Sequence, residues 1–396
     1  MKLPSFVSDL SLPPIEYHHQ LRQWSREMRD SSPVVWDDDS ASWLVFRYDD
    51  VARVQSDYQT FSSEGTIGKK QGQERSANTS IIEMDPPRHR QMRSLITQAF
   101  SARTISGMAP QIEHIVDGLL DELSTRKECD WMADLANPLP IIVIATVLGL
   151  PLEEWPNFKL WTDAIVNESP EREQATWQFS QHFAQAIEER RRQPRSDILS
   201  LLMTSEVEGE RLSYKDLMSF CFTLFIAGNI TTTNVLGNAM LCFHEYPEEL
   251  ERLRQHPELV SSAVEEVIRC MSPFRAGPNG LVLGRVAKTK VDISGQLVQQ
   301  GEMVQVNRLS ANFDERQFPD PERFDIGRNP NRHQSFGHGI HFCLGAPLAR
   351  LEVRIVFEKM VQKFQSLRIV PGTQLKQTQG MLVFGVQSLP MELEIA

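Results

Sequence analysis

Apolar residues recur at helical spacing along most of this chain. In residues 104–123 they repeat every three or four positions, so that they fall on one helical face. The same spacing appears in residues 17–30, 178–193 and 196–205. Helices should therefore form most of the fold.

Alternating patterns, which are typical of strands, are few. Residues 43–49 form one such stretch, and residues 289–307 alternate around Gly295 and Gly301 in the manner of two successive hairpins. The expected fold class is mainly α with a small β-rich subdomain.

The longest predicted helix begins at Ser213 and ends before Pro247. Asp216 follows the serine by three residues, which resembles a capping box. About 32 residues would extend roughly 48 Å. Its centre, however, contains Gly228 and the threonines at 231–233, which are poor choices for a helix interior. Such a break marks either a functional site or a kink that serves packing.

Two stretches lack apolar anchors and are predicted to be long surface loops. They are residues 68–80 and 167–177. Loops of this length are often lids or binding loops, and are otherwise solvated connections.

Composition indicates an ordinary globular protein from a reducing compartment. The 396 residues are 41% hydrophobic and 23% charged. The five cysteines are scattered and odd in number, which argues against a disulfide framework. The N-terminus shows no secretory pattern, and the apolar run Ile141–Leu150 is too short to span a membrane. We therefore expect a cytoplasmic protein without a membrane partner.

Charge excludes one class of partner and suggests another. A net charge of −11 disfavours nucleic-acid binding. Residues 327–354 nevertheless carry four arginines, at 328, 332, 350 and 354, against the single acid Glu352. They form either a basic face for an acidic partner or scattered surface charges.

The stretch SFGHGIHFCLGAPLAR, residues 335–350, presents Cys343 beside two histidines. Zinc ligation by His338, His341 and Cys343 lacks a fourth ligand at the usual spacing. A cysteine nucleophile with His341 as base is disfavoured because residues two apart in a loop rarely face each other. The third alternative is a thiolate ligand to haem iron.

Local features favour the haem alternative. The segment after Cys343 begins a helix, whose N-terminus stabilises a thiolate. Gly337, Gly339 and Gly345 would let the backbone approach a flat macrocycle closely.

The same stretch closely resembles the haem-binding loop of the cytochrome P450 superfamily in its soluble bacterial form. The resemblance implies that Cys343 is the axial ligand of haem b, iron protoporphyrin IX. It assigns the haem propionates to His89, Arg93, Arg285 and His341, packing on the ring to Phe336, and further haem contacts to Gly337, Gly345 and Ala349.

Other family landmarks follow in order. EEVIR resembles the family's Glu-x-x-Arg pair, with Glu266 and Arg269, and FPDPERFDIGR resembles its meander, with Arg323. These three residues are implied to support the cysteine loop. In ANFD, Phe313 stands where the family often has arginine.

AGNITTT resembles the oxygen-binding groove, and implies catalytic positions at Ala227, Gly228, Asn229, Ile230 and Thr231. Thr231 would orient water, but Ile230 replaces the family's acid and cannot move a proton. Thr231 with Asn229 and water could suffice, a substrate group could complete the relay, or the enzyme could favour desaturation or coupling.

Family positions also imply substrate contacts. Besides the 68–80 loop and Asn229, these are Phe225, Ile226, Phe274, Arg275, Ala276, Leu382 and Val383. Each could equally be packing. Arg275 could meet a substrate carboxylate, or could serve at the haem edge or on the surface.

The resemblance covers residues from about 16 to 396 and implies one domain, 1–396, with a triangular-prism P450 fold and haem between the long helix and the Cys343 loop. It implies a monomeric monooxygenase of secondary metabolism that activates O2 to oxidise a hydrophobic substrate. Electrons would come from a separate ferredoxin and its reductase. The Ile230 departure leaves open a peroxide-driven enzyme and a haem-binding protein without turnover.

Overall fold

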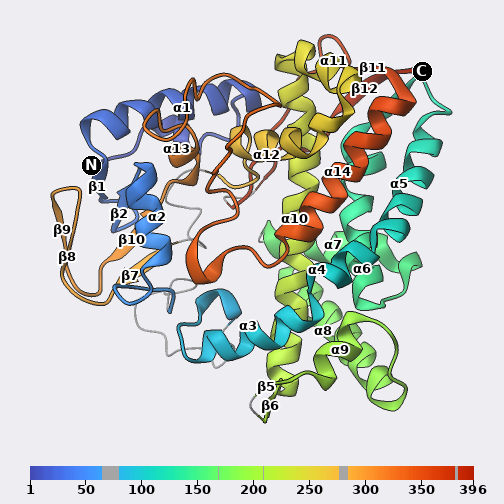
Figure 1. Ribbon diagram of the computed structural model, residues 1–396, viewed down its shortest axis with the longest axis horizontal. Coiled ribbons are helices and arrows are strands. Elements are labelled where there is room, and N and C mark those ends of the chain that lie inside the picture. The colour runs from blue at the N-terminus through green and yellow to red at the C-terminus, as the bar shows by residue number, and fades with distance from the viewer. Residues whose placement is uncertain (65–79, 168, 208, 276–283, 380–381) are drawn as a thin grey trace. The chain divides into compact units, whose positions relative to one another are not determined.

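Helices dominate the computed structural model, as the apolar spacing predicts (Figure 1). The structure describes residues 1–64, 80–167, 169–207, 209–275, 284–379 and 382–396. The chain divides into two units, each treated separately below. Unit 1 comprises Met1–Arg75, Asn234–Cys343 and Arg368–Leu389, and unit 2 comprises Ser76–Thr233, Leu344–Leu367 and Pro390–Ala396.

Unit 1 combines helices with most of the strands. Its helices are α1 (Pro14–Ser31), α2 (Tyr48–Ser56), α11 (Pro247–Gln255), α12 (Val260–Cys270) and α13 (Arg308–Asn312). Its strands are β1 (Val34–Asp37), β2 (Ser42–Val45), β3 (Phe61–Ser62), β7 (Arg285–Ala287), β8 (Val291–Ile293), β9 (Gln296–Val298) and β10 (Met303–Val306).

Unit 2 is almost entirely helical. Its helices are α3 (Arg88–Ala99), α4 (Ala102–Gly107), α5 (Ala109–Leu123), α6 (Pro138–Leu148), α7 (Trp155–Val166), α8 (Arg172–Arg192), α9 (Ile198–Thr204) and α14 (Ala346–Lys363). Short pairings involve β4 (Glu128–Asp130), β5 (Glu206–Val207), β6 (Glu210–Arg211), β11 (Phe364–Ile369) and β12 (Pro390–Ile395). The boundary between the units falls within α10 (Tyr214–Glu245) and within β11.

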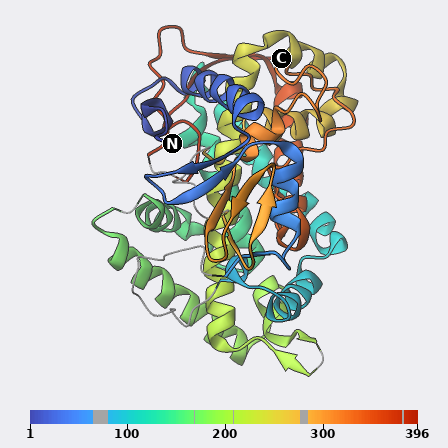
Figure 2. The same cartoon turned by 90° about the vertical axis from the view of Figure 1, so that its left-hand side faces the viewer.

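The five-stranded sheet of unit 1 has the order β1-β2-β10-β7-β3 (Figure 2). Its buried face joins valines of β1, β2 and α2 with Phe61 and Ala311. The predicted alternation around Gly295 is confirmed, since β8 and β9 form an antiparallel hairpin there. After Gly301 the chain enters β10, which pairs with β2 and β7 instead of forming a second hairpin.

The predicted bounds of α10 are confirmed. The Ser213 hydroxyl donates to the Asp216 carboxylate at 2.7 Å, and the Asp216 backbone N–H donates to Ser213 Oγ at 3.1 Å. This reciprocal cap fixes the start, and Pro247 begins the next helix. Of the described helices, α10 alone has the length and apolar composition of a membrane span, and 61% of that apolar window is buried within the protein.

Two local predictions need correction. The helix expected over residues 104–123 is two helices, because Met108 separates α4 from α5 and Pro110 occupies the first turn of α5. The loop expected over residues 167–177 is shorter, since α8 begins at Arg172. Residues 68–79 of the other predicted loop lie outside the described residues.

Candidate functional site

The Cys343 loop in unit 1 is shaped by its own backbone. The Cys343 N–H donates to the Phe336 carbonyl oxygen at 2.9 Å, which closes a turn around the cysteine. Gly337 and Gly339 have positive φ values of 76° and 71°, a region that favours glycine. A Cβ at Gly339 would also lie 2.6 Å from the Ser56 Cα, so this glycine is required sterically as well.

Hydrogen bonds anchor the start of this loop to two helices. The Ser335 hydroxyl donates to the Ile268 carbonyl of α12 at 2.7 Å. Asn312 of α13 donates through Nδ2 to Ser335 Oγ at 2.8 Å and accepts through Oδ1 from the Gln334 N–H at 2.6 Å. The first residues of the loop, Gln334 and Ser335, are therefore held in place by α12 and α13. No motif in the sequence marks Asn312 for this role.

Glu266 and Arg269 of α12 form a buried ion pair next to Asn312. Arg269 donates through Nε and Nη2 to the two carboxylate oxygens of Glu266, each at 2.8 Å, and through Nη1 to the Asn312 carbonyl at 2.9 Å. Burial by itself would raise the pKa of Glu266, but the hydrogen bond and charge of Arg269 lower it below its ordinary value. The pair is thus charged at neutral pH and connects α12 to the loop through Asn312.

The arginine that completes this cluster is Arg328, which the sequence reasoning placed on a basic surface. Its Nε donates to Glu266 Oε1 at 3.1 Å, and only 10% of its side chain is exposed. The predicted meander residue, Arg323, has an exposed side chain and takes part through its carbonyl, which accepts from Arg269 and Arg328. In the structure, the arginine side chain that reaches Glu266 from this segment is that of Arg328.

Phe313, the departure in ANFD, is fully buried between two cations. The guanidinium carbons of Arg22 and Arg269 lie 5.2 and 5.1 Å from its ring centroid. Cation–π attraction makes an aromatic ring compatible with Arg269 at this position.

Two further arginines of unit 1 lie close enough to interact with each other electrostatically. Arg285, a predicted propionate partner on β7, is buried, and its Nη1 donates to the Gly284 carbonyl at 2.8 Å. Arg308 was not predicted. Burial is the main cause that lowers the pKa of Arg308 to about 9, with Arg285 contributing and Cys343 opposing. These arginines and the cysteine thus form one electrostatic neighbourhood.

The predicted propionate partners of unit 2 share one face of α3. His89 and Arg93 are four residues apart, and His89 is 2% exposed. His341, the fourth residue predicted to contact a propionate, lies in the short helical turn Gly339–His341 before Cys343 in unit 1. Their contacts with haem stay predictions.

The central turn of α10 combines a small exposed residue with a hydroxyl. Ala227 is exposed although Phe225 and Asn229 beside it are buried. The Thr231 hydroxyl donates to the Ala227 carbonyl at 2.7 Å, which leaves its oxygen lone pairs able to accept. Ile230 is half-buried.

Asn229 is used in packing within unit 2. It is 1% exposed, and its Nδ2 donates to Thr162 Oγ1 of α7 at 3.2 Å. The Thr233 hydroxyl lies 3.5 Å from its Oδ1. This arrangement does not support the prediction that Asn229 relays protons or contacts substrate.

Several predicted substrate contacts are also explained by packing. Phe225 is fully buried, with its ring 5.1 Å from that of Phe158 and 5.2 Å from that of Phe179, so it belongs to an aromatic core of α7, α8 and α10. It does not line a surface open to substrate. Ile226 is half-buried, and Ala276 lies outside the described residues.

Arg275 is held by protein groups of unit 1. Its Nη1 donates to Gln377 Oε1 at 2.6 Å and its Nη2 to the Thr378 carbonyl at 2.8 Å, and its guanidinium carbon lies 5.4 Å from the Tyr17 ring centroid. These contacts explain the buried cation without a substrate carboxylate. Beside it, Phe274 pairs with Val383 in an isolated β-bridge, and the Arg275 N–H donates to the Leu382 carbonyl.

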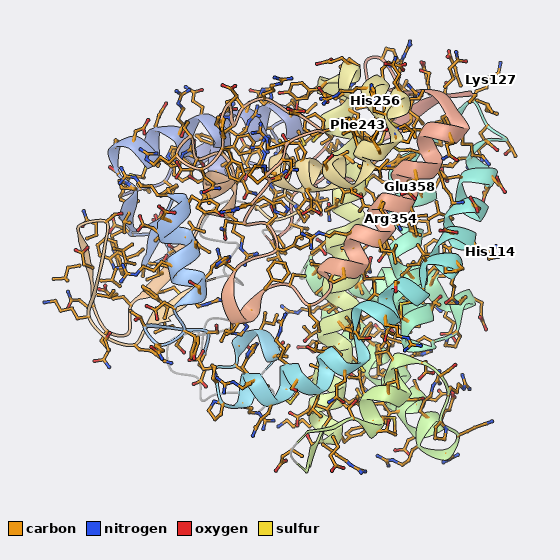
Figure 3. The ribbon with its side chains drawn as sticks, viewed as in Figure 1. His114, Lys127, Phe243, His256, Arg354 and Glu358 are labelled. Carbon is orange, nitrogen blue, oxygen red and sulfur yellow. The ribbon has the colours of Figure 1, made fainter. Side chains whose placement is uncertain are left out.

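The predicted basic face is smaller than its sequence suggests. Arg328 is engaged with Glu266, and Arg354 Nη1 donates to Glu358 Oε1 one turn later on α14 at 2.7 Å (Figure 3). Arg332 is exposed in unit 1. Each remaining docking position therefore has to be tested individually.

These residues fit a haem group better than a zinc ion. Among the described residues, no cluster of three histidine, cysteine or acidic side chains is placed to hold a metal ion. A Cβ at Gly345 would meet no atom within 4 Å, so that backbone is open to a flat group. A thiol beside cations supplies the donor that haem iron requires.

Comparisons with known proteins agree with this fit. The family model for cytochrome P450 matches residues 152–395. The putative cytochrome P450 YjiB of Bacillus subtilis is 40% identical over 93% of each chain, and the polyketide biosynthesis cytochrome P450 PksS of the same organism is 35% identical over 96% of this chain and 97% of its own. The crystal structure of CYP109E1 from Bacillus megaterium in complex with testosterone superposes with a TM-score of 0.85 at 38% identity, covering 94% of this chain and 98% of that one.

Proposed function

This chain belongs to the cytochrome P450 family and is a P450 monooxygenase, and from that premise we propose that it binds haem b through Cys343 and oxidises a small to medium hydrophobic substrate. The observation that carries the proposal is the Cys343 loop, with its two left-handed glycines and its hydrogen-bonded base on Ser335 and Asn312.

Each part of the chain has a distinct task in this proposal. When bound, haem supplies the iron at which O2 is activated. Cys343 would hold the haem iron through its sulfur, and Arg285, His89, Arg93 and His341 would bind the propionates by hydrogen bonds. The Thr231 hydroxyl, which donates to the Ala227 carbonyl, would accept a hydrogen bond from a water molecule in the oxygen-binding groove.

The test is spectroscopic. The purified, reduced protein exposed to carbon monoxide should show the red-shifted absorption band of a thiolate-ligated haem, and Cys343→Ser should lose that band. A wild-type spectrum without the band, or a serine variant that keeps it, would overturn the proposal.

The names of relatives guide the choice of substrate. One relative is named for polyketide biosynthesis and one solved structure contains testosterone. We therefore propose a polyketide-like or steroid-sized molecule, in a role in secondary metabolism. A panel of lipids, steroids and macrolides should contain ligands that shift the Soret band from low spin to high spin.

The Ile230 departure leads to a prediction about coupling. Because isoleucine cannot transfer a proton, we expect much of the reducing power to be lost as peroxide or water instead of product. Ile230→Glu should raise the ratio of product formed to NAD(P)H consumed, by about twofold or more if proton transfer contributes as general acid catalysis usually does. Nearly complete coupling in the wild type, with a substrate that lacks hydroxyl and ionisable groups, would show that the departure has no effect.

Electron delivery is proposed to come from an acidic ferredoxin and its reductase. Arg332 is exposed. It lies four residues after Arg328, whose side chain is hydrogen-bonded to Glu266. Arg332→Glu should slow the first electron transfer at least several-fold at low salt, and added salt should reduce the difference from wild type. A rate equal to that of wild type at low salt would exclude Arg332 from docking.

The remaining proposals concern the whole chain. We propose that it acts as a monomer, as one functional domain over residues 1–396, in the cytoplasm. The lack of a disulfide framework in the sequence and the bacterial P450 relatives support this location.

A further inference from the structure

Arg308 is a cation that the function described above does not use. It begins α13, directly after the cap residue Asn307. Its Nε is buried without a hydrogen-bond partner among the described residues. Its hydrogen bond to a described residue, from Nη1 to the Ser335 carbonyl, is long at 3.4 Å, and no described carboxylate forms an ion pair with it.

The surroundings of Arg308 make this lack of an acid costly. Arg285 adds a second positive charge to the same neighbourhood, and the Arg308 side chain is half-buried with its Nε atom shielded from water. A buried charge is normally compensated by an ion partner and by several hydrogen bonds. The Phe274 ring, 5.9 Å from the guanidinium carbon, supplies only weak cation–π attraction. Arg308 therefore suits an anion that the described residues do not provide.

The position of Arg308 indicates where that anion comes from. A Cβ at Gly337 would lie 3.0 Å from Arg308 Nη2, so the guanidinium lies against the loop that carries Cys343. The Cys343 sulfur and Arg308 interact electrostatically. A group bound through Cys343 that brings its own carboxylates would place an anion beside this loop.

We propose that Arg308 is a second guanidinium for a haem propionate, so that one carboxylate is held between Arg285 and Arg308. The proposal rests on the haem-thiolate function proposed above. The planar fork of arginine suits a carboxylate in two parallel hydrogen bonds, and two forks on one carboxylate account for both charges. Arg308 would thus help to hold the group that Cys343 binds.

The test measures haem retention in the substrate-free holoenzyme. Transfer of haem to excess apomyoglobin should be at least tenfold faster for Arg308→Met than for wild type, because the methionine keeps bulk but loses charge and donors. Arg308→Lys should remain within about threefold of wild type, since it retains the charge. Arg332→Met, which removes an exposed arginine from the segment leading into the same loop, is the matched control and should not change the rate.

Several results would overturn the proposal. Release from Arg308→Met within twofold of wild type would assign the residue a structural role only, and equal acceleration in the lysine and methionine variants would assign the effect to side-chain shape. Unchanged release combined with lost binding of laurate, followed by the spin-state shift, would assign the cation to a substrate carboxylate. If the methionine variant does not fold, Arg308→Gln, which keeps a donor for Ser335, answers the same question.

Failure of the proposed function would look different. In that case the wild-type protein itself would lack the thiolate-type carbon monoxide band. If wild type and Arg308→Met both keep that band and release haem at the same rate, only the inference about Arg308 fails.

Discussion

Two glutamates that are almost inaccessible to solvent behave in opposite ways in the two units. Glu266 of unit 1 is 0% exposed and Glu352 of unit 2 is 2% exposed. Glu266 accepts hydrogen bonds from Arg269, Arg328 and Asn331. Glu352 Oε2 has no hydrogen-bond partner among the described residues. Burial raises the pKa of Glu352 well above its ordinary value, whereas the pKa of Glu266 is lowered.

The difference teaches that partners, and not burial, decide the charge of a buried acid. Burial disfavours the carboxylate in both places. Around Glu266 the cations and amide donors more than offset that penalty, so the group stays ionised and holds α12 to the meander. Glu352 has no such compensation, so burial alone acts on it and raises the pKa of its carboxyl well above the ordinary value. The charge of Glu266 therefore stabilises the fold, whereas ionising Glu352 would destabilise it.

The largest effect should follow from removing the Glu266 charge. Glu266→Gln leaves Arg269 buried beside a neutral partner, which should lower the free energy of unfolding by about 3–5 kcal/mol at pH 7. Urea unfolding measures this change. Glu265→Gln, on the same helix but paired with His333 nearer the surface, should cost less than about 1 kcal/mol. Equal losses in both variants would contradict the comparison.

The same variant has a defined pH dependence. Because the pKa of Glu266 is lower in the folded state than in the unfolded state, its stabilising contribution is present above the unfolded pKa near 4.5 and is lost as pH falls through the folded value. The difference in the free energy of unfolding between wild type and Glu266→Gln, measured by urea unfolding, should therefore become smaller as the pH is lowered below 4.5.

A smaller effect should separate Arg328 from Arg323. Arg328→Met removes a charged hydrogen bond to Glu266 and should cost about 1.5–3 kcal/mol in the free energy of unfolding. Arg323→Met changes an exposed side chain and should stay within about 0.5 kcal/mol of wild type. Thermal or urea unfolding of the two variants measures both values, and the reverse order would show that Arg323 completes the cluster.

The smallest effect should be a gain in stability at Glu352. The unfolded chain releases this proton near pH 4.5 while the folded chain keeps it, so wild-type stability falls as pH rises above that value. Glu352→Gln removes the penalty and should raise the free energy of unfolding at pH 7 by about 1 kcal/mol, but not at pH 4. Unfolding curves at both pH values test this, and a loss of stability at pH 7 would indicate an ionised, paired carboxylate.

Local signals account for what could be predicted from the sequence. The start and end of α10 follow from the Ser213 cap and Pro247, and the hairpin at Gly295 follows from alternation around a glycine. The Cys343 loop is equally local, because left-handed glycines and a following helix stand within a few residues of the cysteine. The poor helix formers near Gly228 were visible too, but α10 runs through them without interruption, and Asn229 packs against α7.

The sequence by itself determined the helical class, through short-range spacing and capping, and the family and the pair Glu266–Arg269, through the resemblance of its motifs. Only the tertiary structure decided that Arg328 reaches Glu266, that Phe225 is core, and that Arg308 lies near Arg285 and pairs with no carboxylate of the described residues. The physical reason is that a charge's state depends on which groups surround it in space, and those groups come from segments far apart in the chain.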